Sequence, residues 1–209
     1  MPWTAKSTWG IFERPRISTR VIFLSVGLIL FGIGEGLLVE SRLGNAPWTV
    51  LSEGVSLNTP FNIGESTVLV SLIVFAIWFP LKLKPGFGTI ANIILIAVAL
   101  QISVDAIKTP DSFFGKLIFV LSGILAVGIG SGLYITCGLG AGPRDGLMTG
   151  LNQRTGIRVG RIRLMLELIA LTIGWLLGGK VGLGTALFGL LVGQSVAISF
   201  GVVERFTKR

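Results

Sequence analysis

Two short motifs combine proline, glycine and charge in a way that could bind a charged solute. The segment GLGAGPRDGL, residues 138–147, ends a run of 26 uncharged residues with a proline and an Arg-Asp pair. The segment RLGNAPWTVL, residues 42–51, shares its L-G-x-x-P-x-x-x-L pattern. Proline favours the first position of a helix, where free N–H groups carry a partial positive charge that suits an anion. Each motif therefore predicts a tight turn and a short helix, over 47–56 and 143–153.

Two placements of these short helices remain open. They dip into the membrane and line a central path for an anionic or zwitterionic solute, or they lie on the two surfaces as structural corners. Irregular backbone at membrane depth is tolerated where protein or water covers it. A carboxylate at position 145 is also favourable simply because it lies near the start of its own helix. The candidate solute-binding residues are Asn45, Pro47, Trp48, Thr49, Gly142, Pro143, Arg144 and Asp145.

Two glutamates within apolar runs are candidates for coupling solute movement to an ion. A carboxylate inside the membrane costs about 2.5–3.5 kcal/mol on the insertion scale, so its presence indicates function. Glu35, in GIGEGLL, binds a proton or a solute ammonium group, or reaches the interface and has no role. Glu167 follows Arg163 by four residues, which is the spacing of a structural ion pair along a helix.

Other polar residues point to binding or packing and not to catalysis. Gln101 and Gln194 are amides in two further apolar runs, and they either bond to neighbouring helices or line the solute path. The chain has no histidine and one cysteine, Cys137, so it lacks the commonest general base and any multi-cysteine metal site. Paired carboxylates and the phosphate-binding G-x-x-x-x-G-K-[ST] motif are absent too. We expect no catalytic residue, no metal, no cofactor and no enzyme activity.

The composition indicates that helices in a lipid bilayer position these residues. Apolar residues make up 51% of the chain and charged residues 13%, against about 25% in soluble proteins. The net charge of +8 is spread between apolar runs and forms no patch for nucleic acid. A helix crosses the hydrocarbon core with about 20 residues. Six runs qualify, the last two with polar starts: 19–39, 86–106, 116–137, 181–203, 63–81 and 162–179.

The charges that flank these runs predict the orientation of the chain. Of 18 Lys and Arg residues, 14 fall on the side that contains both termini and four on the other. Cytoplasmic loops are enriched in Lys and Arg, so we expect six spans with both termini in the cytoplasm of a bacterial inner membrane. The two runs with polar starts end in Trp78 and Trp175, which we expect at the headgroup level.

The sequence contains an internal repeat with an offset of 96 residues. Without a gap, residues 21–54 match residues 117–150 at 13 of 34 positions, including both L-G-x-x-P-x-x-x-L motifs. Each half holds three spans, an odd number, so the second half enters the membrane from the opposite side. The expected fold is an all-α polytopic membrane protein with six transmembrane helices in two inverted three-helix repeats, each with a short helix that begins at a proline after its first span.

The repeat also predicts the division of the chain and one close contact. The expected segments are a cytoplasmic N-terminal segment (1–18), repeat 1 (19–106), an extracytoplasmic connector (107–116), repeat 2 (117–203) and a cytoplasmic tail (204–209). Glycines recur at matching positions of the first and fourth spans, and small residues let membrane helices approach closely. We therefore expect these two helices to cross each other.

The segments GLGAGPRDGLMTGLNQRTG (138–156) and RLGNAPWTVLSEGVS (42–56) resemble those of the bacterial YczE-like membrane proteins, relatives of the YitT group. The likeness covers nearly the whole chain, and the second copy is the more specific motif. The resemblance implies a multi-pass inner-membrane protein, described as a transporter without an established substrate. Family members are often encoded beside regulators built on a pyridoxal-phosphate enzyme fold, which implies a vitamin B6 or amino-acid-related solute. The resemblance supplies no catalytic residues, and the halves differ where Trp48-Thr49 stands in place of Arg144-Asp145.

Three functions are compatible with these features. The inverted repeat favours a small secondary carrier or channel for an anionic or zwitterionic solute. Its partners would be the lipid bilayer and the solute, with no nucleic acid, and we expect a homo-oligomer because six helices enclose little space. A ligand-capturing subunit of an ATP-driven vitamin importer has a similar size but lacks an inverted duplication. A membrane accessory protein for a partner enzyme would have no central cavity.

Overall fold

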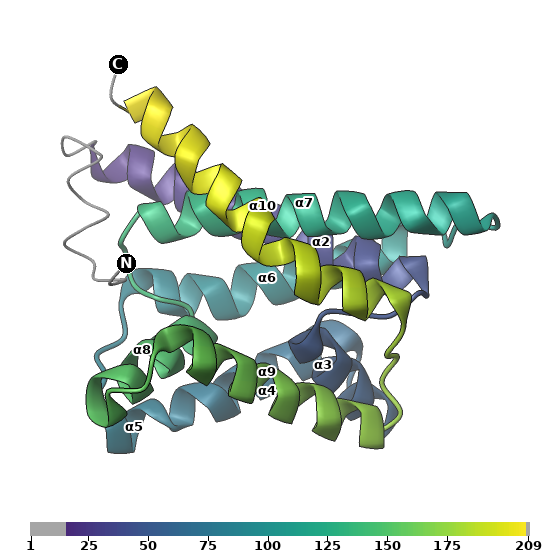
Figure 1. Ribbon diagram of the computed structural model, residues 1–209, viewed down its shortest axis with the longest axis horizontal. Helices are drawn as coiled ribbons and strands as arrows, with labels where there is room; N and C mark the ends of the chain where they lie inside the picture. The colour runs from purple at the N-terminus through teal and green to yellow at the C-terminus, as the bar shows by residue number, and fades with distance from the viewer. Residues whose placement is uncertain (1–15, 208–209) are drawn as a thin grey trace.

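The computed structural model describes residues 16–207, which form α-helices joined by short connections (Figure 1). The helices are α2 (Ile17–Ser41), α3 (Pro47–Leu57), α4 (Ile63–Ala76), α5 (Trp78–Leu81), α6 (Phe87–Ala106), α7 (Phe113–Thr136), α8 (Pro143–Thr155), α9 (Val159–Leu176) and α10 (Leu183–Thr207). Residues 1–15 of the predicted N-terminal segment and residues 208–209 of the predicted tail lie outside the described residues.

Five helical segments are long and apolar enough to cross a membrane. They are Ile17–Ser41, Ile63–Leu81, Phe87–Ala106, Phe113–Thr136 and Leu183–Val203. Large apolar side chains such as Phe79 and Leu190 are exposed on their outer faces, as expected where a surface contacts lipid. Helix α9 has 18 residues, but three of them, Arg161, Arg163 and Glu167, are charged, so it is not among these five segments. The structure is that of an all-α, multi-pass membrane protein.

Local sequence sets the boundaries of the short helices. Pro47 and Pro143 are the first residues of α3 and α8, as the two motifs predict, and each follows an extended residue. Proline at this position loses no hydrogen bond, because the first N–H groups of a helix have no partner within it. Helix α8 ends at Gly156, whose φ of 71° is the left-handed conformation that commonly terminates helices.

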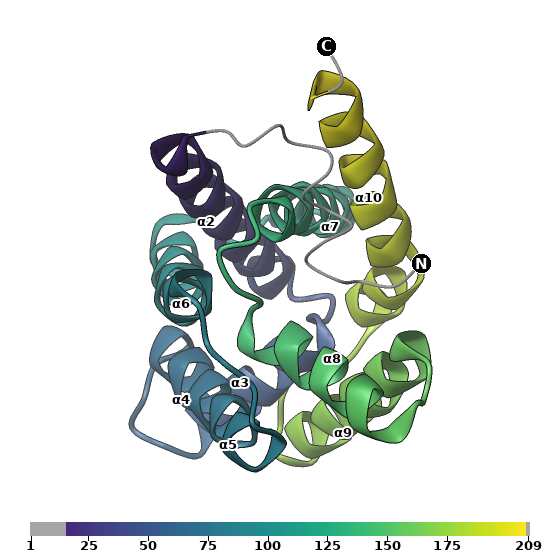
Figure 2. The same ribbon diagram turned by 90° about the vertical axis from the view of Figure 1, so that its left-hand side faces the viewer.

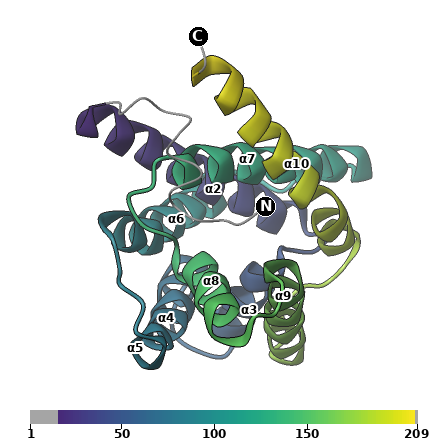
Figure 3. The same ribbon diagram turned by 60° about the vertical axis from the view of Figure 1, so that its left-hand side comes forward.

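Figures 1 and 3 show two groups of helices. In the first group, α2 crosses α7, with α6 packed on α2 and α10 packed on α7. In the second group, the short helix α3 packs on α4 and α9, and α8 packs on α4, α5 and α9. Figure 2 shows α8 between α4 and α9. Contacts between α4 and α6 join the two groups.

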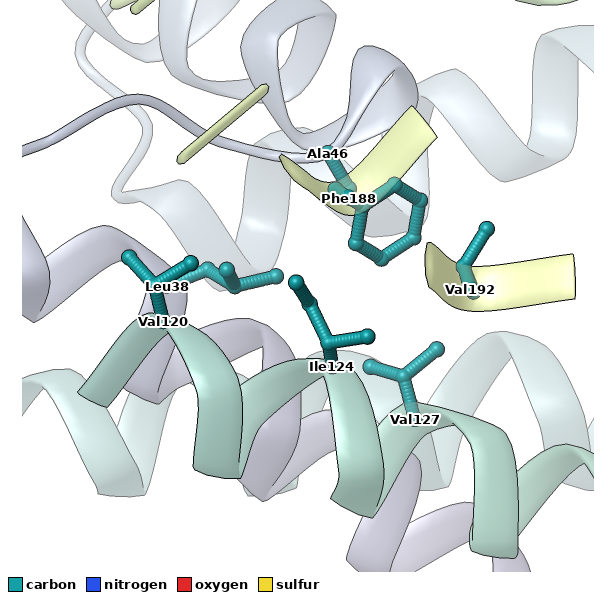
Figure 4. Packing of buried hydrophobic residues seen from close by; sticks show 7 residues of the cluster. All are labelled: Leu38, Ala46, Val120, Ile124, Val127, Phe188 and Val192. Carbon is teal, nitrogen blue, oxygen red and sulfur yellow. The ribbon is translucent and has the colours of Figure 1, made fainter. Parts of the chain in front are cut away.

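An apolar cluster holds α10 against α7 and α2 (Figure 4). Side chains of α7 face Phe188 and Val192 of α10. Close packing is the main attraction here. Lipid tails are as apolar as the side chains, so the helices gain no hydrophobic stabilisation by leaving lipid for one another. The cluster comprises Leu38, Ala46, Val120, Ile124, Val127, Phe188 and Val192.

Helices α2 and α7 approach each other closely at glycines. A Cβ atom at Gly34 would lie 2.7 Å from the carbonyl oxygen of Gly123, and one at Gly27 would lie 2.9 Å from that of Gly130. Residue numbers rise along α2 as they fall along α7 at these contacts, so the two helices are antiparallel (Figure 1). The close crossing that the recurring glycines predict is confirmed.

The two halves contain corresponding helices at the offset found in the sequence. Adding 96 to the first residues of α2, α3, α4 and α6 gives the first residues of α7, α8, α9 and α10. Contacts between the halves also correspond. The Gly88 N–H donates to the carbonyl of Leu139 at 2.8 Å, and the Gly184 N–H donates to that of Leu43 at 2.8 Å. Each half therefore holds the turn before the short helix of the other half.

The two tryptophans that end the apolar runs differ in their surroundings. Trp175 is exposed, but Trp78 is buried, and its indole N–H donates to the carbonyl of Pro143 at 2.9 Å. The same ring lies against Gly146, where any side chain would collide with it. Trp78 therefore anchors the start of α8.

Candidate functional site

The first turns of α3 and α8 meet inside the molecule. Trp48 and Arg144 are the second residues of these helices and occupy equivalent positions of the repeat, 96 residues apart. The guanidinium carbon of Arg144 lies 5.1 Å from the centroid of the Trp48 ring, within the range of a cation–π contact. Two partially positive helix ends and one guanidinium group thus lie close together.

The guanidinium of Arg144 also faces the intramembrane carboxylate of α2. Its Nη1 atom lies 3.6 Å from Oε1 of Glu35, and the side chains are 20% and 1% exposed. The other carboxylate oxygen, Oε2, is buried and has no hydrogen-bond partner among residues 16–207. Neighbouring Gly34 packs on α7 and Gly36 packs on α6, so the backbone around Glu35 is held on both sides. Glu35 consequently lies in the protein interior.

The next residue of α8 extends this site to α7. The carboxylate of Asp145 accepts a hydrogen bond from the hydroxyl of Tyr134. Helix α8 is too short to span the membrane, with 13 residues. Burial raises the pKa of the Asp145 carboxyl to about 6, and the positive charge of Arg163 acts in the opposite direction. Asp145 can therefore exchange a proton near neutral pH.

Helix α9 contributes the remaining charges. Arg163 Nε lies 2.7 Å from Oε1 of Glu167, so the predicted i,i+4 pair is present. Burial lowers the pKa of the Arg144 guanidinium, whereas the negative charges of Glu35 and Glu167 raise it. Glu167 is thus close enough to act on Arg144. We name Glu35, Trp48, Tyr134, Arg144, Asp145, Arg163 and Glu167 the central charge cluster.

Other predicted residues of the two motifs shape the turns beside this cluster. Thr49 is fully buried, and its hydroxyl oxygen has no hydrogen-bond partner in the described part of the chain. Pro47 and Pro143 begin the short helices, and Gly142 lies against Asn92 of α6, whose amide nitrogen would be 2.8 Å from a Cβ at that glycine. These residues position Trp48 and Arg144 and leave one free hydroxyl next to them.

Three predicted residues lie outside the cluster. Asn45 donates to Glu53 at 2.7 Å and its backbone N–H donates to the carbonyl of Lys180 at 3.2 Å, which forms a corner between the halves. Gln101 accepts from the Gly64 N–H at 3.0 Å and so joins α6 to α4. Gln194 is exposed on α10. Their predicted role in solute binding has no support from this placement.

Sequence reasoning missed Tyr134, and the signal for it is weak. It is the one tyrosine of the chain, in an apolar run 11 residues before Asp145. A phenol in such a run needs a polar partner, which is the only hint that the sequence offers. The cluster as a whole combines two guanidinium groups with three carboxyl groups. Among residues 16–207 no three His, Cys, Asp or Glu side chains could hold a metal ion.

Comparisons with known proteins identify the family of the chain. The model of a family of unknown function (DUF6198) matches residues 18–200. The chain belongs to this family. An "Uncharacterized protein" of Haemophilus influenzae is 45% identical over 203 residues, which cover 97% of this chain and 91% of the relative. The "Uncharacterized membrane protein YczE" of Bacillus subtilis is 31% identical over 183 residues, or 86% of this chain and 85% of the relative.

The resemblance to YczE-like membrane proteins is thereby confirmed for this DUF6198 member. A second Bacillus subtilis relative, "Uncharacterized protein YyaS", is 22% identical over 190 residues, or 89% of this chain and 94% of the relative. No solved structure matches the chain.

Proposed function

We propose that this DUF6198 protein is a small secondary carrier, which moves an anionic or zwitterionic solute across the bacterial inner membrane by alternating access. The observation that carries the proposal is Arg144 at the meeting point of two helix N-termini, against Trp48 and the buried Glu35. A guanidinium at a helix N-terminus suits an anionic group, and Glu35 suits a proton or an ammonium group. Secondary carriers recurrently point the N-termini of interrupted or short helices at their substrate.

Two inverted repeats are the architecture that this proposal requires. The antiparallel crossing of α2 and α7 and the exchange of equivalent hydrogen bonds between the halves support it. In this architecture α9 is the fifth of six spans. The pairing of Arg163 with Glu167 at 2.7 Å lowers the cost of placing these charges in a membrane helix. The 14:4 distribution of Lys and Arg favours a cytoplasmic location for both termini.

A difference between the halves supports alternating access. In the first half, α4 packs on α6, and a Cβ at Gly64 would lie 2.8 Å from the Cβ of Gln101. The equivalent positions, 96 residues later, are Gly160 of α9 and Ala197 of α10. A Cβ at Gly160 meets no described atom within 4 Å. The contact between α4 and α6 is therefore closed, and the equivalent contact between α9 and α10 is open. We take these two contacts as the gates of the carrier, and an alternating carrier would exchange the two arrangements.

Ligand-dependent unfolding of the purified protein tests the binding part of this proposal. The panel contains small anions, amino acids and B6 vitamers. A ligand at 100 times its dissociation constant adds about 2.7 kcal/mol to the free energy of unfolding. We expect at least one member of the panel to stabilise the wild type, and Arg144→Gln to abolish that stabilisation while remaining folded.

Arg161→Gln is the matched control, because Arg161 is an exposed arginine of α9 outside the cluster. This variant should keep the full stabilisation. A panel that leaves the folded wild type unchanged contradicts the proposal and favours an accessory role in the membrane. Stabilisation that survives Arg144→Gln would place the solute elsewhere.

A further inference from the structure

Glu35 occupies the place where a solute carboxylate would bind. It is the one group that pairs with the guanidinium of Arg144 by direct ion pairing among the described residues, at 3.6 Å. That separation is longer than the 2.7–2.9 Å of a good charge-assisted hydrogen bond, so the N–H donors of Arg144 are not firmly engaged. The guanidinium carbon lies over the Trp48 ring at 5.1 Å, and a planar carboxylate would approach the edge of the guanidinium, where the donors lie.

We propose that Glu35 is an internal competitor of the solute and couples its transport to a proton. A solute carboxylate displaces the Glu35 carboxylate from Arg144, and Glu35 takes up one proton. Before the exchange the site holds one guanidinium and one carboxylate, and afterwards it holds one guanidinium, one solute carboxylate and one neutral carboxyl. The charge of the site is therefore unchanged when one anion and one proton enter together. This inference rests on the proposed carrier function and specifies its substrate class and its coupling ion.

Burial explains why Glu35 takes a proton when it loses Arg144. Its side chain is 1% exposed, and Oε2 already lacks a hydrogen-bond partner within residues 16–207. Helices α6 and α7 pack on Gly36 and Gly34 and prevent the backbone from carrying the side chain toward water. A buried carboxyl without a cation is neutral, because desolvation penalises the charged form.

The other charged groups of the cluster cannot replace Arg144 as the partner of Glu35. On α9, Arg163 is held by Glu167 at 2.7 Å. On α7, the hydroxyl of Tyr134 donates to Asp145 of α8. The cluster therefore has two guanidinium groups for three carboxyl groups, and an incoming anion makes its net charge more negative by one. A proton that enters with the anion returns the net charge to its value before binding.

The repeat shows that the chain has one such site and not two. The equivalents of Glu35 and Arg144 are Ser131 and Trp48, neither of which is charged. Since Trp48 contacts Arg144, the two equivalent positions combine into a single site between the halves. One site per chain predicts one proton for each carboxylate.

Binding of pyruvate and lactate to the full-length protein in detergent, between pH 6 and 8, tests this inference. In the wild type we expect the dissociation constant to rise about tenfold for each pH unit, because each anion binds with one proton. Titration calorimetry in buffers of different ionisation enthalpy should report uptake of one proton per anion. Glu35→Gln removes the competing charge, so it should bind the same anions at least tenfold more tightly at pH 8, with no dependence on pH.

Glu40→Gln is the matched control, since Glu40 also lies on α2 but accepts a hydrogen bond from Thr109 and not from the cluster. It should keep the pH dependence. Binding by the wild type without proton uptake, or loss of binding in Glu35→Gln, would overturn the inference and leave the carrier function standing. Absence of pyruvate and lactate binding would also overturn it. The proposed function fails with it only if the whole panel of anions, amino acids and B6 vitamers fails to bind.

Discussion

Replacing Arg144 with glutamine leaves Glu35 buried without a cation, and the cost of this change can be worked from the structure. At 3.6 Å and an effective dielectric constant of about 20, the attraction between the two charges is about 4.6 kcal/mol. Removing one member of a buried pair typically costs about 3–5 kcal/mol. We therefore expect Arg144→Gln to lower the free energy of unfolding by about 3–5 kcal/mol at pH 8.

A double-mutant cycle in reversible unfolding experiments in mixed micelles measures the pair itself. The double variant Glu35→Gln/Arg144→Gln should be more stable than the sum of the single changes predicts, by about 2 kcal/mol or more. The control pair is Arg163 and Glu167, whose side chains are 39% and 23% exposed, and its coupling energy should stay below about 1 kcal/mol. Additive effects at Glu35 and Arg144, within about 0.5 kcal/mol, would refute the buried pair.

Three further predictions follow from packing, protonation and the difference between the halves. Gly34→Ala should destabilise the protein by about 1–3 kcal/mol in the same unfolding assay, because its Cβ would lie 2.7 Å from the backbone of Gly123. Gly189→Ala, which meets no described atom within 4 Å, should cost nothing, and equal losses would contradict the close crossing of α2 and α7. The pKa of Asp145 is raised from 3.8 to about 6, so the folded state binds more protons and stability should fall as the pH rises through this interval. Asp145→Asn should lack that part of the pH dependence of thermal unfolding, and an unchanged profile would refute the assignment. In a Cys137→Ser background, cysteines at Gly64 and Gln101 should form a disulfide after a small separation of α4 and α6, since the two Cβ positions lie 2.8 Å apart and a disulfide needs about 3.5–4.5 Å. Cysteines at Gly160 and Ala197 should cross-link only when α9 closes on α10, and ligand-independent cross-linking of both pairs would contradict alternating gates.

The boundaries of the short helices could be predicted from the sequence because they depend on local chemistry. Pro47 and Pro143 begin α3 and α8 as expected. The preference of proline for the first position of a helix depends on the backbone of only a few residues. The repeat predicted that equivalent helices begin 96 residues apart, which the starts of α2 and α7 illustrate. The recurring glycines predicted their close crossing.

The partners of the site residues could not be predicted, because packing between the halves decides them. Glu35 and Arg144 were each candidates, but they are 109 positions apart (144 − 35) and no local pattern joins them. Gln101 had the same two interpretations as Gln194, and the structure places Gln101 between helices and leaves Gln194 exposed. The position of Trp78 at the end of an apolar run likewise gave no indication that it donates to the carbonyl of Pro143, 65 positions later.

Counterflow in proteoliposomes tests the carrier function most directly. Vesicles are loaded with an unlabelled ligand that stabilises the purified protein, and uptake of the labelled ligand from a dilute external solution is followed. A carrier with alternating access predicts transient accumulation of label above its equilibrium level, lost in Arg144→Gln and kept in Arg161→Gln. Folded protein that produces no accumulation, or a flux that does not depend on the internal ligand, would contradict the account.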